Sequence, residues 1–121
     1  MWTVDFHLIE PWLDEQDAGT VAAIFAAFEV LEREGPSLGR PLVDSIRGTA
    51  TKGLKELRPA SPGRSEVRIL FAFDPLRRAV MLLAGDKAQG KRSRSRWSGW
   101  YRTAIPQAEA LLQAHMRESR P

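Results

Sequence analysis

The residues of this 121-residue sequence best suited to chemistry are lysines and arginines, and they gather in its later part. Residues 1–36 hold eight acids and one base, a net charge of −7, whereas residues 37–121 hold seven acids and 17 bases, a net charge of +10. This asymmetry predicts a positive surface that binds a polyanion such as a nucleic acid. The alternative is a basic face that is merely solvated.

The bases come from neighbouring segments, and adjacent antiparallel strands lie within about 5 Å of each other, so one concave face could collect them. The alternative is that Arg58 and Arg68 form cross-strand pairs with Glu56 and Glu66 and that the run at 91–96 is a solvated loop. Against this alternative, residues 47–102 hold 14 bases and only four acids. The candidate binding residues are Lys52, Lys55, Arg58, Arg64, Arg68, Lys87, Lys91, Arg92, Arg94 and Arg96.

Aromatic residues follow the basic run directly. Trp97, Trp100, Tyr101 and Arg102 place ring planes beside positive charge, a combination that stacks nucleic-acid bases while holding phosphates. The competing interpretation is a core stripe, because their spacing also fits one face of a helix. We expect Trp100 to be partly buried and Tyr101, with its hydroxyl, to reach solvent.

Several classes of site have no support in the sequence. There is no cysteine, and the two histidines are interpreted as a half-buried strand residue (His7) and a helix-surface residue (His115) rather than catalytic bases. Metal-ligand spacings, phosphate-binding glycine loops and the GxSxG motif are absent, so we expect no metal and no cofactor. No apolar run is long enough for a membrane span and no leader is evident, which predicts a cytoplasmic protein.

The elements that must position these residues follow from periodicity. Residues 2–8 alternate apolar and polar positions, as in a strand whose residues Trp2, Val4, Phe6 and Leu8 point inward. Residues 10–34 have helical spacing with Asp17 as a cap and Gly35 as a stop, which predicts a helical pair or one bent helix.

The later elements are predicted to be three strands and a helix. Residues 37–53 are interpreted as a long connection, and strands are predicted at 54–58, 66–73 and 79–84. A helix follows from Trp97, and Pro106 should kink it or mark a fresh start. We therefore predict a single α+β domain over residues 1–121, a small antiparallel sheet with packed helices in the order β-α-α-β-β-β-α.

Five segments of the sequence are characteristic in their order and residues: EGPSLGRPLVDSIRG at 34–48, LKELR at 54–58, GRSEVRILFAFDP at 63–75, AVMLLAGDK at 79–87 and WYRTAIPQAEALL at 100–112. With these segments, the layout resembles the RelE/ParE toxin superfamily of type II toxin–antitoxin systems, and most closely its HigB-like, phage-derived branch.

The resemblance implies a RelE-like fold and a toxin that cleaves messenger RNA in the ribosomal A site. The RNA's own 2′-hydroxyl attacks the adjacent phosphate, so no metal is needed, but enzyme groups must move protons and stabilise charge. The implied partners are messenger RNA on the ribosome and a cognate antitoxin with a helix-turn-helix DNA-binding domain.

The family's site residues correspond to Lys55, Arg68, Lys87 and Tyr101. The resemblance implies charge stabilisation or base catalysis for Lys55, contact with the scissile phosphate for Arg68, and stacking or proton transfer for Tyr101. Asp86 would orient Lys87, and Arg58, Arg64 and Arg102 would hold neighbouring phosphates.

The sequence departs from the family's pattern after the last strand, where HigB-type enzymes often place a histidine and this chain has Gly85, Asp86 and Lys87. Two other functions therefore stay open at this point. One is inhibition of DNA gyrase, as by ParE-type relatives of the same fold, and the other is nucleic-acid binding without catalysis.

Overall fold

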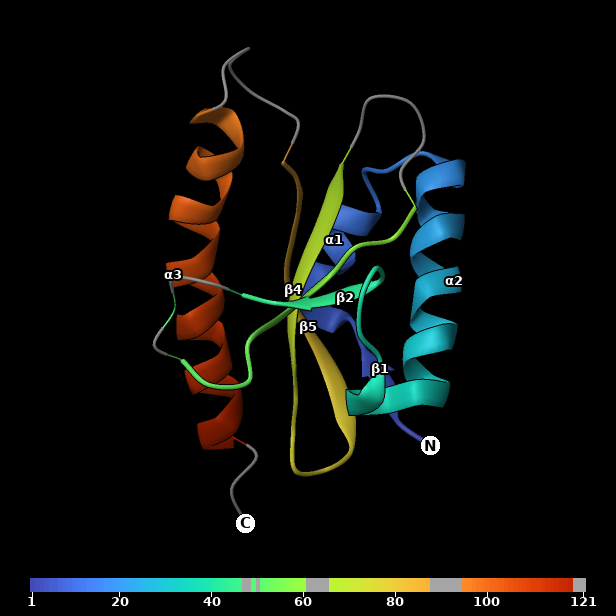
Figure 1. Cartoon of the computed structure of the whole chain (residues 1–121), viewed down its shortest axis with the longest axis vertical. Helices are drawn as coiled ribbons and strands as arrows, with labels where there is room; N and C mark the ends of the chain where they lie inside the picture. Colours follow the sequence, from blue (N-terminus) through green and yellow to red (C-terminus); the bar gives the residue numbers. More distant parts are fainter. Residues whose placement is uncertain (47–48, 50, 61–65, 88–94, 119–121) are drawn as a thin grey trace.

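A five-stranded sheet lies between helices on both of its faces, as Figure 1 shows. The computed structural model describes residues 1–46, 49, 51–60, 66–87 and 95–118, the last of these without the side chains of 95–98. This arrangement confirms the α+β class. The elements are β1 (Thr3–Asp5), α1 (Glu10–Leu13), α2 (Ala18–Glu34), β2 (Val43–Ser45), β3 (Lys55–Leu57), β4 (Val67–Phe73), β5 (Arg78–Asp86) and α3 (Ser95–Glu118), with short 3-10 turns at His7–Ile9 and Gly35–Ser37.

The sheet is mixed rather than purely antiparallel. Its strand order is β1-β5-β4-β3-β2. The pairings of β3 with β4 and of β4 with β5 are antiparallel, as predicted, and so is the pairing of β2 with β3. In contrast, β1 lies parallel to β5. A tight turn such as that between β4 and β5 forces an antiparallel pairing, whereas β1 and β5 are neighbours in the sheet but far apart in the sequence. The alternation of apolar and polar residues along β1 does not indicate whether the strand pairs parallel or antiparallel to its neighbour.

The N-terminal strand is shorter than its alternating pattern predicts. It ends at Asp5, and residues His7–Ile9 form a 3-10 turn, so Leu8 is exposed instead of pointing inward. His7 is also exposed and pairs with Asp5, which corrects its interpretation as a half-buried strand residue. Val4 and Phe6 do pack against the core, as predicted.

The helical pair over residues 10–34 is confirmed as α1 and α2. The carboxylate of Asp17 accepts a hydrogen bond from the Thr20 N–H at 2.7 Å, so it caps α2 as expected. Gly35 ends the helix with a φ of 59°. None of the helices in the described ranges is long and apolar enough to cross a membrane.

The segment from residue 37 to 53 contains a strand that the sequence did not reveal. β2 spans only Val43–Ser45 and pairs with β3. Three residues are too few to show an alternating pattern, so only the tertiary pairing with β3 identifies this edge strand.

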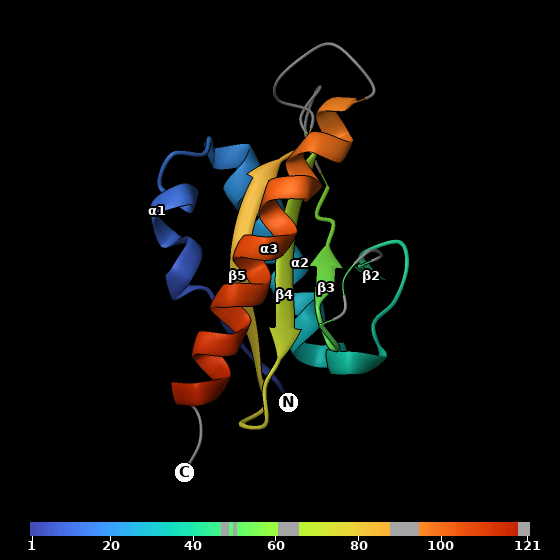
Figure 2. The ribbon, with the colours of Figure 1, turned by 90° about the vertical axis from the view of Figure 1, so that its left-hand side faces the viewer.

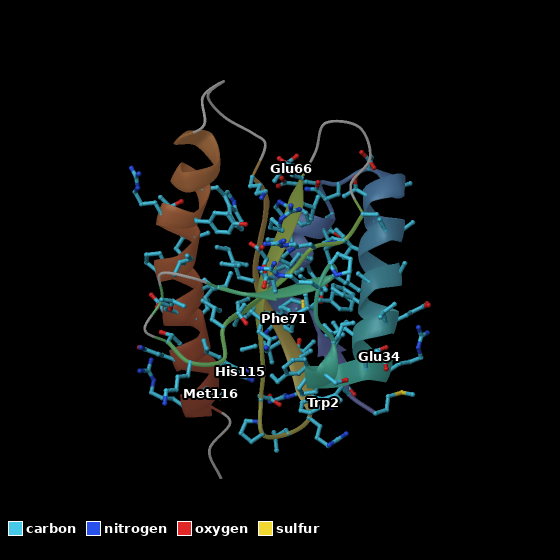
Figure 3. The ribbon with its side chains drawn as sticks, viewed as in Figure 1. Trp2, Glu34, Glu66, Phe71, His115 and Met116 are labelled. Atoms are coloured by element: carbon cyan, nitrogen blue, oxygen red, sulfur yellow. The ribbon has the colours of Figure 1, made fainter. Side chains whose placement is uncertain are left out.

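Residues of the central strands alternate between two cores. Ile69 and Phe71 pack toward α1 and α2, whereas Leu70 packs toward α3. A bulge opposite Leu70 and Phe71 places two successive residues of β5, Leu82 and Leu83, on the α3 side. Figure 3 shows Phe71 in the middle of the sheet layer, between the two long helices.

α3 runs as one helix along the sheet, and Figure 2 shows it lying across β4 and β5. The exposed Pro106 lies inside it, so the predicted fresh start does not occur. Its buried apolar residues are Ala104, Ala108 and Leu112.

The C-terminal part of α3 is anchored by His115, which is buried and not on the helix surface as predicted. Its Nε2 lies 2.9 Å from Oδ2 of Asp74, a buried residue of the β4–β5 turn, and the same oxygen accepts a hydrogen bond from Nε of Arg78. The helical pattern alone could not show that this turn would bury a carboxylate against His115. Figure 3 shows His115 near the end of α3.

We predict that Gly35→Ala destabilises the protein. A Cβ at this position would lie 2.5 Å from Cδ1 of Trp2, on a backbone with positive φ. The free energy of unfolding, measured by urea denaturation, should fall by about 1–3 kcal/mol. The control is Gly39→Ala, because nothing lies within 4 Å of a Cβ there. Equal stability of the two variants would contradict the prediction.

Candidate active site

A pocket of about 590 Å³ opens between strands β2 and β3 and the N-terminal half of α3. Acidic, basic, aromatic and aliphatic side chains share its surface. The lining residues are Arg40, Asp44, Ser45, Ile46, Glu56, Arg58, Lys87, Tyr101 and Ile105.

The carboxylate of Glu56 lies at the centre of the polar contacts. Glu56 is opposite Leu70 in the sheet, so its side chain faces α3, and only 1% of the residue is exposed. Its Oε2 accepts a hydrogen bond from the Tyr101 hydroxyl at 2.5 Å, and its Oε1 accepts one from Nε of Arg58 at 2.7 Å. A buried carboxylate needs such partners, because an unpaired charge in the interior is costly.

Tyr101 is held in its protonated form. Burial raises the pKa of its hydroxyl well above the ordinary value, and the hydrogen bond to the Glu56 carboxylate raises it further. At neutral pH this group therefore acts as a hydrogen-bond donor or as one member of a proton relay, and not as a phenolate. The sequence predicts that Tyr101 reaches solvent. In the structure its side chain is half-buried, so it reaches solvent only in part.

Arg68 lies beside this pair on the same face of the sheet. Its Nη1 donates to the Val67 carbonyl, and its Nε is 3.9 Å from Oε1 of Glu56. Within the described part of the chain, this buried Nε donates no hydrogen bond. Arg58 pairs with Glu56 and Arg68 with Glu66, the latter at 3.9 Å, but each pair lies two residues apart along one segment. The pair that crosses between β3 and β4 is Arg68 with Glu56.

Lys87 lies at the end of β5, with its Nζ 5.8 Å from the centre of the Tyr101 ring. Burial lowers the pKa of this amine, and the positive charge of Arg68 lowers it further. A lysine of lowered pKa gives up its proton more readily than a solvated one and is a candidate general acid.

The ends of β4 and β5 fix the position of Lys87. The Asp86 carboxylate accepts a hydrogen bond from the Glu66 N–H at 2.8 Å, and the Lys87 N–H donates to the Glu66 carbonyl at 3.1 Å. Gly85 is equally constrained, since a Cβ there would lie 2.3 Å from Nε1 of Trp100. α3 can approach β5 this closely only because residue 85 is glycine.

The fold brings together part of the set predicted from the sequence. Lys87, Tyr101 and Arg58 line one pocket, with Arg68 next to it. Lys55 does not join them, because it is paired across the sheet with Phe71, whose side chain belongs to the opposite core. Residues directly opposite in a ladder share a face, so Lys55 faces away from Tyr101.

The remaining predicted residues lie around or beyond this pocket. Lys52 and Arg102 are exposed, and Trp100 is half-buried, as predicted for it, with its ring 5.0 Å from that of Tyr101. Arg64, Lys91, Arg92 and Arg94 lie outside the described residues. Arg96 and Trp97 belong to the first turns of α3, but their side chains are not described.

Sequence reasoning did not select Glu56, Asp44 or Arg40 for the site. A signal for Glu56 was present, because it is in phase with Leu54, which packs against the α3 core. Asp44 and Arg40 carried no comparable signal, since the strand that contains Asp44 was not predicted. In the described ranges, no group of three or more His, Cys, Asp or Glu residues is placed to hold a metal ion.

We predict that the phenol of Tyr101 resists ionisation. It is the only tyrosine, so ultraviolet absorbance titration reports it alone. Ionisation should begin well above pH 10, the usual tyrosine midpoint, and Glu56→Gln should lower the midpoint because the neighbouring negative charge is lost. Tyr101→Phe, which has no phenol, supplies the baseline. A wild-type midpoint near 10 would show that the Glu56 contact does not form in solution.

Comparison with known proteins places this sequence in a family. The model of the family described as phage-derived protein Gp49-like matches residues 11–113. The chain is 52% identical over 117 residues to "Putative toxin HigB2" of Mycobacterium tuberculosis (strain ATCC 25618 / H37Rv), covering 97% of this chain and 55% of that protein. It is 43% identical over 101 residues to "Putative toxin HigB3" of the same strain, covering 84% of this chain and 81% of that protein.

The chain thus spans about half the length of the first of these relatives and most of the second. No solved structure matches it significantly. The matches agree with the phage-derived, HigB-like resemblance of the sequence. The chain belongs to the Gp49-like family of phage-derived proteins.

Proposed function

We propose that this chain is the toxin of a toxin–antitoxin system and that it cleaves messenger RNA on the ribosome without a metal ion. The names of its two relatives support the toxin assignment. The observation that carries the cleavage chemistry is the pocket in which Glu56, Tyr101, Arg58 and Lys87 converge. This set can move protons and neutralise a phosphate.

The proposed reaction uses the RNA's 2′-hydroxyl as the nucleophile. Its oxygen forms a bond to the adjacent phosphorus while the bond from phosphorus to the 5′-oxygen breaks, which leaves a 2′,3′-cyclic phosphate and a 5′-hydroxyl. The 2′-hydroxyl must lose a proton, the 5′-oxygen must gain one, and the pentavalent transition state carries extra negative charge.

Each requirement has a candidate group in the pocket. The Tyr101 oxygen accepts the proton of the 2′-hydroxyl as its own proton passes to Glu56, along the hydrogen bond already present. Lys87 donates a proton to the departing 5′-oxygen. Arg58, which lines the pocket, and Arg68, which lies next to it, supply positive charge for the developing negative charge, as paired cations do in phosphoryl sites. Lys55, on the other face, has no part in this scheme, and its predicted role stays a sequence-based prediction.

The proposed partners follow from the same scheme. The substrate is messenger RNA bound to the ribosome, which places the protein in the cytoplasm. A cognate antitoxin with a helix-turn-helix domain would hold the toxin inactive. A surface rich in basic residues is readily masked by an acidic or amphipathic segment, and such charge complementarity speeds association.

Inducible expression in bacteria, with transcript ends mapped by primer extension, tests the proposal. The wild type should arrest growth and create new ends inside translated messages. Tyr101→Phe and Glu56→Gln should reduce cutting by about a hundredfold or more, the typical contribution of positioned proton transfer. Arg33→Ala, which removes a positive charge from the exposed side of α2, should cut normally.

The other outcomes point to other functions. Growth arrest without new ends would contradict RNA cleavage and favour inhibition of DNA gyrase, which a supercoiling assay would detect. A wild type that neither arrests growth nor cuts would favour a binding module, whose affinity should fall gradually with each base removed and steeply with salt.

The pH dependence of cleavage tests the role of Lys87. Only the charged amine can donate a proton, so the rate should fall as pH rises through its pKa, which lies below the ordinary value of 10.5. Lys87→Arg should be slower at neutral pH and should lose this alkaline decline, because arginine stays protonated. Single-turnover cleavage of a ribosome-bound message measures both effects. An unchanged alkaline limb in the variant would assign the acid elsewhere.

A further inference from the structure

We propose that the part of the pocket formed by β2 is a guanine-binding subsite and that Asp44 selects this base. The inference rests on the proposed function, because it assumes that RNA enters the same pocket. It adds the identity of the base next to the reacting phosphate and the residue that reads it.

Asp44 and the reactive groups belong to one continuous surface. Asp44 is opposite Glu56 in the β2–β3 ladder, so both side chains point to the α3 side of the sheet. Arg58 joins them, since its Nε donates to Glu56 and its Nη2 lies 3.2 Å from Oδ2 of Asp44. A single guanidinium group therefore bridges the two carboxylates.

The walls of this part of the pocket suit a flat aromatic ligand. Ile46 and Ile105 line the pocket, and both side chains pack against the core beneath α3, which keeps them in place. The Tyr101 ring forms a further wall. The volume of about 590 Å³ lies within the range of small-ligand sites, roughly 300–1,000 Å³, and leaves room for a nucleotide.

The chemistry of Asp44 favours guanine among the four RNA bases. The hydrogen bond from Arg40 lowers the pKa of this carboxyl, so at neutral pH it only accepts hydrogen bonds. Guanine presents two adjacent donors, N1–H and the 2-amino group, on one edge. Adenine and cytosine offer an amino group beside a ring acceptor, and uracil offers one N–H between two carbonyls. Only guanine can therefore donate two parallel hydrogen bonds to a carboxylate.

Asp44 can accommodate this ligand at the expense of one weak contact. Its Oδ1 accepts the Ser45 N–H at 2.9 Å, and its Oδ2 contacts both Arg58 and Arg40. A carboxylate has about four acceptor positions. The Arg40 side chain is 68% exposed, and ion pairs of this kind contribute little, so guanine can replace Arg40 on Asp44.

Calorimetric titration of the purified full chain with guanosine and adenosine 5′-monophosphate tests the subsite. The wild type should bind the guanine nucleotide at least about tenfold more tightly, the usual discrimination from a bidentate contact. Asp44→Asn should lose this preference, because its carboxamide replaces one acceptor with a donor. The matched control, Asp14→Asn, removes the same charge from an exposed position and should keep the preference.

A change in the ligand tests the contact without any change in the protein. Inosine 5′-monophosphate lacks only the 2-amino group of guanine, so the wild type should bind it about tenfold less tightly than guanosine 5′-monophosphate. Equal affinities for the guanine, adenine and hypoxanthine nucleotides would overturn the proposal, as would a guanine preference that survives in a folded Asp44→Asn protein.

The binding measurements separate this inference from the proposed function, because they do not require cleavage. A guanine preference in a chain that cuts no RNA would support the guanine subsite and contradict the proposed ribonuclease activity. Conversely, RNA cleavage by a chain that binds all three nucleotides equally would support the ribonuclease activity and contradict the guanine subsite.

Discussion

The structure depends on the burial of two carboxylates beneath one helix. Glu56 on β3 and Asp74 in the β4–β5 turn are 1% and 4% exposed, and each needs a hydrogen-bond donor in a place that water hardly reaches. α3 supplies Tyr101 to the first and His115 to the second. Arg58 and Arg78 also donate to these carboxylates, so loss of a helix contact removes one of several donors rather than the whole pairing. A buried acceptor that loses its donor still costs more than the loss of one surface ion pair.

These two anchors determine where α3 lies and therefore what the pocket contains. Between these two anchors, the helix packs on the sheet through small and aliphatic residues that include Ala104, Ala108 and Leu112. Such residues let the helix lie close to the sheet but do little to fix its position along the strands. The contact of Tyr101 with Glu56 sets that register at the N-terminal half of the helix. The same carboxylate orients Arg58, so a single buried acid organises the aromatic and basic groups that line the pocket.

The edge strand β2 completes the pocket and is closed to further pairing at two of its N–H groups. The Val43 N–H donates to the Gly39 carbonyl, and the Ser45 N–H donates to the side chain of Asp44. Internal satisfaction of an edge discourages the addition of another strand. Asp44 therefore has two effects, because it caps the edge with one oxygen and faces the pocket with the other.

Local pattern was enough to predict the helical pair, the three later strands and the concentration of basic residues, because periodicity, caps and turn residues act over a few neighbouring positions. It also brought Arg68, Lys87 and Tyr101 into consideration through their place in those elements. Local pattern could not reveal the three-residue β2, the parallel pairing of β1, the burial of His115 or the separation of Lys55 from the pocket. Each of these depends on which distant segment lies opposite, and a buried acid such as Glu56 is tolerable only when residues remote in the chain, here Tyr101, arrive to pair with it.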